Sequence, residues 1–166
     1  MRMYAYLILA VLVTALLFQP LCEVVMVCKD RITFDSAVNN AVRAAKKESY
    51  NYVDMRDAVA TTNQAKFMDE FARVLAVGLD DLSYSGGASY ATTLRDSGGN
   101  FDDTRVRFYF STENIGGRSA VKVHISAESE YKFKTRMMKD AQELILRTSG
   151  AYMLTHDRTY TLIIVN

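Results

Sequence analysis

The sequence is poor in the residues that supply most metal-binding, catalytic and cross-linking chemistry. Its 166 residues include two histidines, two cysteines, one proline and no tryptophan. The 20 Lys and Arg nearly balance the 19 Asp and Glu, and no basic patch or acidic tail occurs, so a nucleic-acid partner is not indicated. Cys22 and Cys28 both precede the polar part of the chain. On one helix they lie about 9 Å apart along its axis, too far to pair, so the rest of the chain has no disulfide framework.

Candidate catalytic patterns are weak. His124 falls on the polar side of an expected strand, and His156 with Asp157 is expected in a turn without further metal ligands. Ser119 and Lys122 have the S-x-x-K form of serine acyl-transferases, but they begin an expected strand and lack companion motifs. The paired glycines lack a phosphate-binding context. We therefore expect no catalytic residue, no metal and no cofactor, and predict that the protein is not an enzyme.

What the sequence does have is a long apolar run at its start. No Lys or Arg occurs in residues 3–27. The clearly polar residues in this range are Thr14, Gln19 and Glu23. An apolar helix of about 20 residues crosses the hydrocarbon core of a bilayer, so residues 1–28 are predicted to be a transmembrane anchor.

Two alternatives to a retained anchor remain open. A cleaved signal peptide would use Arg2 and the apolar residues 7–18, but residues 19–23 lack an Ala-x-Ala exit site. A buried helix of a soluble protein is the other. Within an anchor, Pro20 is tolerated and Glu23 is expected near the far headgroups. A sharper hypothesis is that one of these two residues contacts another membrane helix.

The orientation of the anchor is weakly specified by charge. Arg2 precedes the span, whereas Lys29 and Arg31 follow it, which gives little preference under the positive-inside rule. A short N-terminal tail and a signal-like start favour an external head. We therefore predict a single-pass protein of the cell membrane with an extracytoplasmic C-terminal head.

Residues 29–50 are predicted to continue the anchor as an amphipathic helix, giving one helix of about 45 residues. Its apolar stripe is rich in small residues and is a candidate helix-packing or partner interface. The stripe comprises Ala37, Val38, Ala41, Val42 and Ala45. It is expected to pack against the chain's own head, and packing along neighbouring copies is the alternative.

Residues 51–166 are predicted to form an α+β head. A short helical turn is expected at 53–60, and a capping box, Thr61-x-x-Gln64, is expected to begin a second helix that ends at Gly78. Residues 80–103 look loop-like, with a short strand at 89–94. Within this loop Tyr84 and Tyr90 are a candidate binding site, and an ordinary connector is the alternative.

After the loop the period of apolar residues changes from 3.6 to 2. Residues 104–113 and 119–131 alternate, and the segment between them, 114–117, is predicted to be a hairpin connection. Helical spacing returns in residues 137–150, and residues 160–165 read as a final strand. The expected head therefore has helices packed on one face of a three- or four-stranded antiparallel sheet.

The order of these segments, with the run Asp35–Ala45 just beyond the span, resembles the pilin-like proteins, most closely the TadE/TadG-type minor pseudopilins of tight-adherence systems. Since Met3–Leu7 lacks the usual glycine and glutamate of prepilins, the resemblance implies a permanently anchored accessory protein that helps to assemble, prime or decorate a thin surface filament. It implies the lipid bilayer, other pilin-like or membrane assembly proteins and further copies of the chain as partners. The alternative function is a membrane-tethered module that binds a ligand or envelope protein through the Tyr-rich loop or the polar face of the sheet.

Overall fold

The computed structural model describes residues 2–49, 63–79, 82–84, 86, 89–95, 101, 103–115, 118–131, 133, 135–146 and 152–165. Along the chain its elements are α1 (Arg2–Glu48), α3 (Gln64–Gly78), β1 (Ala91–Leu94), β2 (Thr104–Ile115), β3 (Arg118–Tyr131), α4 (Arg136–Leu146) and β4 (Tyr152–Val165). The predicted α+β class, a long N-terminal helix followed by a small head, is confirmed. The helical turn expected at 53–60 lies outside the described residues.

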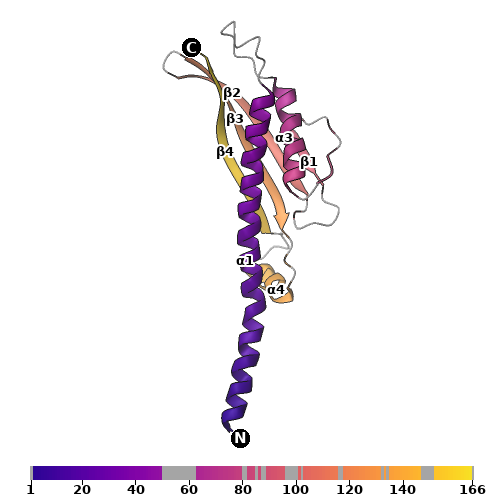
Figure 1. The fold of residues 1–166 in the computed structure, drawn as a ribbon, viewed down its shortest axis with the longest axis vertical. Helices are drawn as coiled ribbons and strands as arrows, with labels where there is room; N and C mark the ends of the chain where they lie inside the picture. Colours follow the sequence, from indigo (N-terminus) through magenta and orange to yellow (C-terminus); the bar gives the residue numbers. More distant parts are fainter. Residues whose placement is uncertain are drawn as a thin grey trace.

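Helix α1 is the axis of the molecule (Figure 1). Its 47 residues span about 70 Å at 1.5 Å per residue. Pro20 lies inside the helix without ending it, and Lys46 and Lys47 in the last turn complement the negative end of the helix dipole. The N-terminal half of α1 projects beyond the head, and the C-terminal half lies alongside it, so the predicted continuity of the helix is confirmed.

The described strands form one antiparallel sheet in the order β1-β2-β3-β4. Ile115 pairs with Arg118, which places the predicted hairpin between β2 and β3; residues 116–117 themselves lie outside the described residues. Val106 and Phe108 are buried, whereas Arg105 and Arg107, which alternate with them, are exposed. The period-2 pattern therefore predicted the inner face of β2 correctly.

Strand β4 is longer than the sequence suggested. It begins at Tyr152, and its first half pairs with β3 up to Tyr131. The β3–β4 register shifts at one point, because Val121 pairs with Ile163 but Lys122 pairs with Thr161. The extra residue on β4, Leu162, is buried. The bulge interrupts strict alternation within residues 160–165, the part of β4 that the sequence predicted as a strand, whereas residues 152–159 were not predicted.

The core lies between the sheet and the two helices α1 and α3. Phe71 packs edge-on against Phe108, with ring centroids 5.1 Å apart. Helix α3 ends at Gly78 as predicted, but its N-cap is Asn63, whose side-chain oxygen accepts a hydrogen bond from the Lys66 amide at 3.0 Å. The N-cap of α3 is therefore Asn63 and not the predicted Thr61. Thr61 itself lies outside the described residues.

Helix α4 occupies a different place from α3. It lies beside α1, below the lower ends of the strands and nearest the projecting half of α1 (Figure 1). Met138 packs against the core cluster, whereas Met137 and Leu144 stay exposed. The helical spacing predicted for this segment is thus present, but much of its apolar side does not cover the sheet.

Candidate functional site

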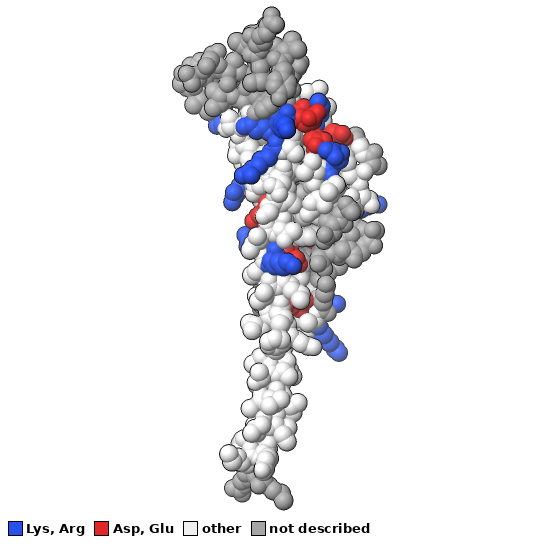
Figure 2. Space-filling view, viewed as in Figure 1, with Lys and Arg blue, Asp and Glu red and all other residues white. Residues whose placement is uncertain are grey.

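The projecting half of α1 is an uncovered apolar surface. Figure 2 shows it as a shaft without Lys, Arg, Asp or Glu below the charged head. Side chains such as Leu12 (61% exposed), Leu16 (65%) and Phe18 (62%) point outward all round the helix. Within the described residues, α1 is the one helix long and apolar enough to cross a membrane. Surfaces of this kind mark contact with lipid or protein rather than water.

The predicted packing stripe on the other half of α1 is buried within the chain. The exposed fractions of its members do not exceed 6%. All five, Ala37, Val38, Ala41, Val42 and Ala45, belong to the core cluster with α3 and the sheet. Their small size brings the elements close together, since a Cβ on Gly78 would lie 3.2 Å from that of Ala37. Another chain could reach this stripe only by displacing the head.

The two tyrosines of the candidate binding loop are both anchored to α3. The Tyr84 hydroxyl donates a hydrogen bond to Asp69, and its ring packs partly against the core. The Tyr90 hydroxyl donates to Gln64 Oε1 at 2.8 Å, although 57% of its side chain is exposed. These contacts hold both tyrosines against the helix. A ligand of the hydroxyls would have to compete with them.

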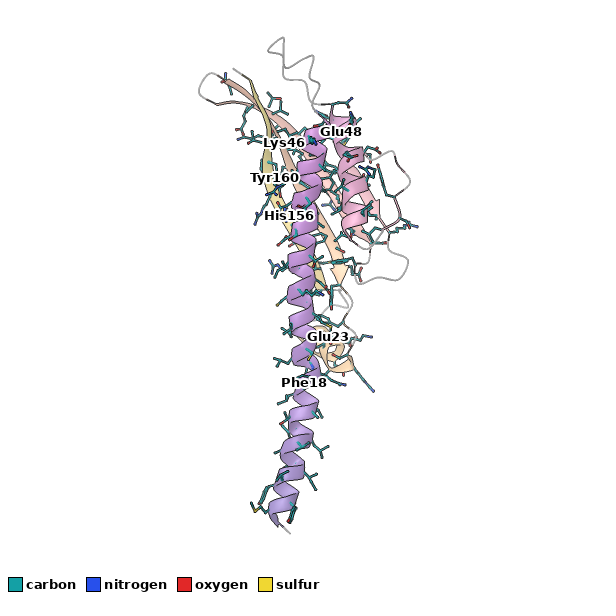
Figure 3. All side chains as sticks on the ribbon, in the orientation of Figure 1. Phe18, Glu23, Lys46, Glu48, His156 and Tyr160 are labelled. Carbon is teal, nitrogen blue, oxygen red and sulfur yellow. The ribbon has the colours of Figure 1, made fainter. Side chains whose placement is uncertain are left out.

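A chain of four polar side chains joins α1 to β4, and Figure 3 labels two of them, His156 and Tyr160. His156 is 3% exposed. Its Nδ1 lies 2.7 Å from Asp35 Oδ1, and its Nε2 lies 2.8 Å from the Tyr160 hydroxyl. That hydroxyl in turn donates to Asn39 Oδ1 at 2.8 Å, while Asn39 Nδ2 donates to the Asp35 carbonyl oxygen.

The protons in this network can be counted. Asn39 is oriented by its donation to the Asp35 carbonyl, so its side-chain oxygen accepts the one proton of Tyr160. Burial raises the pKa of the Tyr160 phenol, which favours the protonated donor. The Tyr160 oxygen is then an acceptor for His156 Nε2, and the Asp35 carboxylate is an acceptor for Nδ1. His156 thus bridges the Tyr160 hydroxyl and the carboxylate of Asp35, whose side chain is 40% exposed.

The sequence-based reading of His156 was wrong. We expected His156 and Asp157 together in a turn, but they are consecutive residues of β4 and point to opposite faces of the sheet. Asp157 instead pairs with His124 across the exposed face, with His124 Nε2 2.8 Å from Asp157 Oδ1. Alternation through Leu154 and His156 was the signal that could have placed the histidine on the inner face. Nothing local could have named Asp35 as its partner.

Glu23 gives α1 a second polar contact with the rest of the chain, and it is 4% exposed. Both of its carboxylate oxygens lie 3.2 Å from the Thr135 amide nitrogen, and the Thr135 hydroxyl donates to Oε2. Thr135 precedes α4, and its carbonyl oxygen accepts from Lys139. The carboxylate therefore sits at the positive end of the α4 dipole. Figure 3 shows Glu23 on α1 at the level of α4.

Over the described ranges, no three His, Cys, Asp or Glu side chains gather closely enough to hold a metal ion. No protein-family model, curated protein or solved structure matches this chain. The features that bear on function are therefore those of the chain itself: the apolar shaft, the α1–β4 network and the Glu23–Thr135 contact.

Proposed function

We propose that this chain is a single-pass protein of the cell membrane with an extracytoplasmic head, and that it acts without catalysis. Its role is that of a pilin-like accessory protein in the assembly of a surface filament of the tight-adherence type, or of a related envelope complex. The observation that carries the proposal is the continuity of α1. One helix presents an exposed apolar half and supplies a large part of the core of the head.

The exposed half favours a lipid environment strongly. Burying one large aliphatic side chain contributes about 1.5–3 kcal/mol, and side chains of this kind surround the shaft. The apolar residues from Met3 to Glu23 span about 30 Å, the thickness of the hydrocarbon core. Lys29 and Arg31 follow beyond the level of Glu23, where headgroups and water can solvate them.

The way the head is attached favours an assembly role over a tethered binding module. Because no flexible linker interrupts α1 between Arg2 and Glu48, the head is held in a fixed direction and rotation relative to the anchor. A subunit that must pack beside other membrane proteins uses such a fixed orientation. The alternative, binding through Tyr84 and Tyr90, is less favoured because both hydroxyls are already engaged with α3.

Contacts with partner helices would then be made inside the membrane, since the upper stripe is already occupied. Ala10 and Thr14 lie one turn apart on the exposed shaft, and the Thr14 hydroxyl donates to the Ala10 carbonyl oxygen at 2.8 Å. Small residues spaced in this way allow two membrane helices to approach closely. Pairing of helices at this position is the contact that the proposal requires.

Topology is the first part to test, with a C-terminal tag and protease added to intact cells. We expect external protease to remove the tag while the chain itself fractionates with membranes at full length. A protected tag would place the head inside the cell and would overturn the proposal. A shortened, released product would show that residues 1–28 are a signal peptide.

Assembly is the second part, tested by Ala10→Phe with Leu12→Phe as its control on the other side of the helix. Each variant would be cross-linked in cells, copurified with its neighbours, and its host examined for surface filaments by electron microscopy. We expect Ala10→Phe to lose cross-links and filaments and Leu12→Phe to keep both. Normal filaments in a strain that lacks the chain altogether would contradict an assembly role.

A further inference from the structure

Helix α4 leaves an apolar side uncovered. Met137 is 49% exposed and Leu144 is 82% exposed. With Ala141 they follow the i, i+4, i+7 spacing of one helical side. The charged side chains are exposed and lie on a neighbouring side of the helix: Arg136, Lys139, Asp140 and Glu143. A helix with this division of side chains is amphipathic, although the side that should be covered faces outward.

The position of α4 along α1 is fixed by Glu23. Thr135, which precedes α4, contacts the Glu23 carboxylate through both its amide and its hydroxyl. Glu23 lies about 20 residues, or about 30 Å, along the helix from Met3. This length equals the thickness of the hydrocarbon core, so α4 begins at the level where the core of a bilayer around α1 would end.

We propose that α4 is an interfacial helix, lying in the headgroup layer of the same bilayer that α1 crosses, with Met137 and Leu144 inserted among the lipids. Glu23 is the positioning residue that holds α4 at this depth. The inference rests on the membrane anchoring proposed above. It adds a second point of contact between the head and the lipid, and so fixes the tilt of the head.

Lipid fits this side of α4 better than a protein partner does. The uncovered apolar side of an 11-residue helix is small, whereas stable protein interfaces bury about 1,200–2,000 Å² in total. The lower half of α1, which projects beyond α4, exposes large apolar side chains round the helix. Lipid that surrounds this shaft therefore reaches α4 without any further partner.

The charges of α4 make a further distinction among lipids. Its exposed cations, Arg136 and Lys139, are balanced by Asp140 and Glu143. The charges of α4 itself therefore give no net attraction to anionic headgroups, although Lys132, Lys134 and Arg147 flank it in the sequence, and apolar insertion is the interaction to be tested. Vesicles of zwitterionic phosphatidylcholine should be sufficient for binding.

The same arrangement stabilises the charge of the Glu23 carboxylate. A carboxylate at the edge of the hydrocarbon core is unfavourable unless polar groups cover it. Here Thr135, immediately before α4, supplies the hydrogen-bond donors, and α4 supplies the positive end of its dipole. The helix covers the carboxylate, and the carboxylate in turn places the helix at the membrane surface.

The absence of tryptophan makes the test direct, because a single introduced Trp reports its own surroundings. Three full-length variants would be reconstituted in phosphatidylcholine vesicles: Leu144→Trp, Val13→Trp in the shaft, and Tyr109→Trp on the exposed face of the sheet. The lipids would carry bromine, which quenches Trp fluorescence, either near the glycerol or near the chain ends. Near-ultraviolet circular dichroism would confirm that each head is folded.

We expect Leu144→Trp to lose most of its emission with lipid brominated near the glycerol, and Val13→Trp with lipid brominated near the chain ends. Tyr109→Trp should be quenched by neither. An unquenched Val13→Trp would show that the shaft is not in the bilayer and would overturn the proposed function. A quenched Val13→Trp with an unquenched Leu144→Trp would overturn the interfacial helix alone, whether water or a second copy covers α4.

The positioning role has its own test. In the Leu144→Trp background, Thr135→Val removes the hydroxyl donor to Glu23 and keeps the size of the side chain. Glu23→Gln removes the charge instead. We expect each change to reduce quenching of Leu144→Trp and, when made in the Val13→Trp background instead, to leave the quenching of that shaft reporter unchanged. Unaltered quenching in both folded variants would overturn the role of Glu23.

Discussion

The two halves of α1 have the same backbone geometry and opposite surroundings. In the lower half, large side chains such as Leu16 and Phe18 are 65% and 62% exposed. In the upper half, Phe34, Val38 and Ala41 are completely buried. The lower half carries large apolar residues round the helix, interrupted by small ones such as Ala10, whereas in the upper half the small Ala37 lies where α3 comes close. One helix can therefore have an exposed half and a buried half if the size and the distribution of its apolar residues change along its length.

The largest expected difference between the halves comes from removing a phenylalanine from each. Phe34 stacks on Phe101 with ring centroids 6.2 Å apart, so Phe34→Ala should leave a cavity and destabilise the head by about 3–5 kcal/mol. Phe18→Ala, the matched change in the lower half, should leave the head's stability unchanged. Urea titration of the full chain in detergent micelles, followed by near-ultraviolet circular dichroism, measures both. Equal losses would mean that the two halves are not separate environments.

Enlarging a side chain should also destabilise the head in the upper half of α1 and not in the lower half. Ala41→Leu overfills a completely buried site and should cost about 1–3 kcal/mol in the same titration. Ala10→Leu makes the identical change on the exposed shaft, and we expect no effect on unfolding. If Ala41→Leu were as stable as the parent chain, the upper stripe would have room for a partner, contrary to its burial.

The polar network between α1 and β4 can be broken by deleting one hydroxyl. Tyr160→Phe leaves His156 Nε2 and Asn39 Oδ1 without their present partner, and an unsatisfied buried group costs about 1–3 kcal/mol. The control is Tyr109→Phe, since Tyr109 is 57% exposed on the other face of the sheet. Thermal unfolding of the two variants measures the difference. A loss of stability in the control alone would contradict the network.

The smallest expected effect is the ion pair that joins the end of α1 to α3. Lys66 lies 2.9 Å from Glu48, and its hydrogen bond and charge lower the pKa of the Glu48 carboxyl below the ordinary 4.5. The pair therefore stabilises the fold above that pH, and its contribution is lost as pH falls through the lowered pKa. Because both side chains are half-exposed, Lys66→Met should change stability only slightly at pH 7. Unfolding curves of parent and variant should converge under acid conditions. If the difference in stability grew as the pH fell, the Lys66–Glu48 pair would not be its cause.

Local periodicity was sufficient to predict most elements. The apolar run predicted α1, and the alanine-rich stripe predicted its buried side. The alternation from Val106 to Phe108 predicted the inner face of β2. Partners distant in sequence were beyond such patterns. Asp35 meets His156 and Glu23 meets Thr135 more than a hundred positions away, and neither pairing leaves a local trace. The position of α4 was missed for the same reason, since its spacing specifies an apolar side but not what that side contacts.

The contact between Asp35 and His156 also sets the order of events during synthesis, because 121 positions separate the two residues. Ribosomes add about 5–20 residues per second, so roughly 6–24 s pass between their emergence. In a chain whose anchor inserts as it emerges, the first half of α1 is in the bilayer throughout this interval. Helix α3 can cover the stripe soon after residues 64–78 have been made, but the contacts of α1 with β4 must wait until residues 152–165 have been added. The side of α1 that contacts β4 is thus among the last parts of the head to be completed.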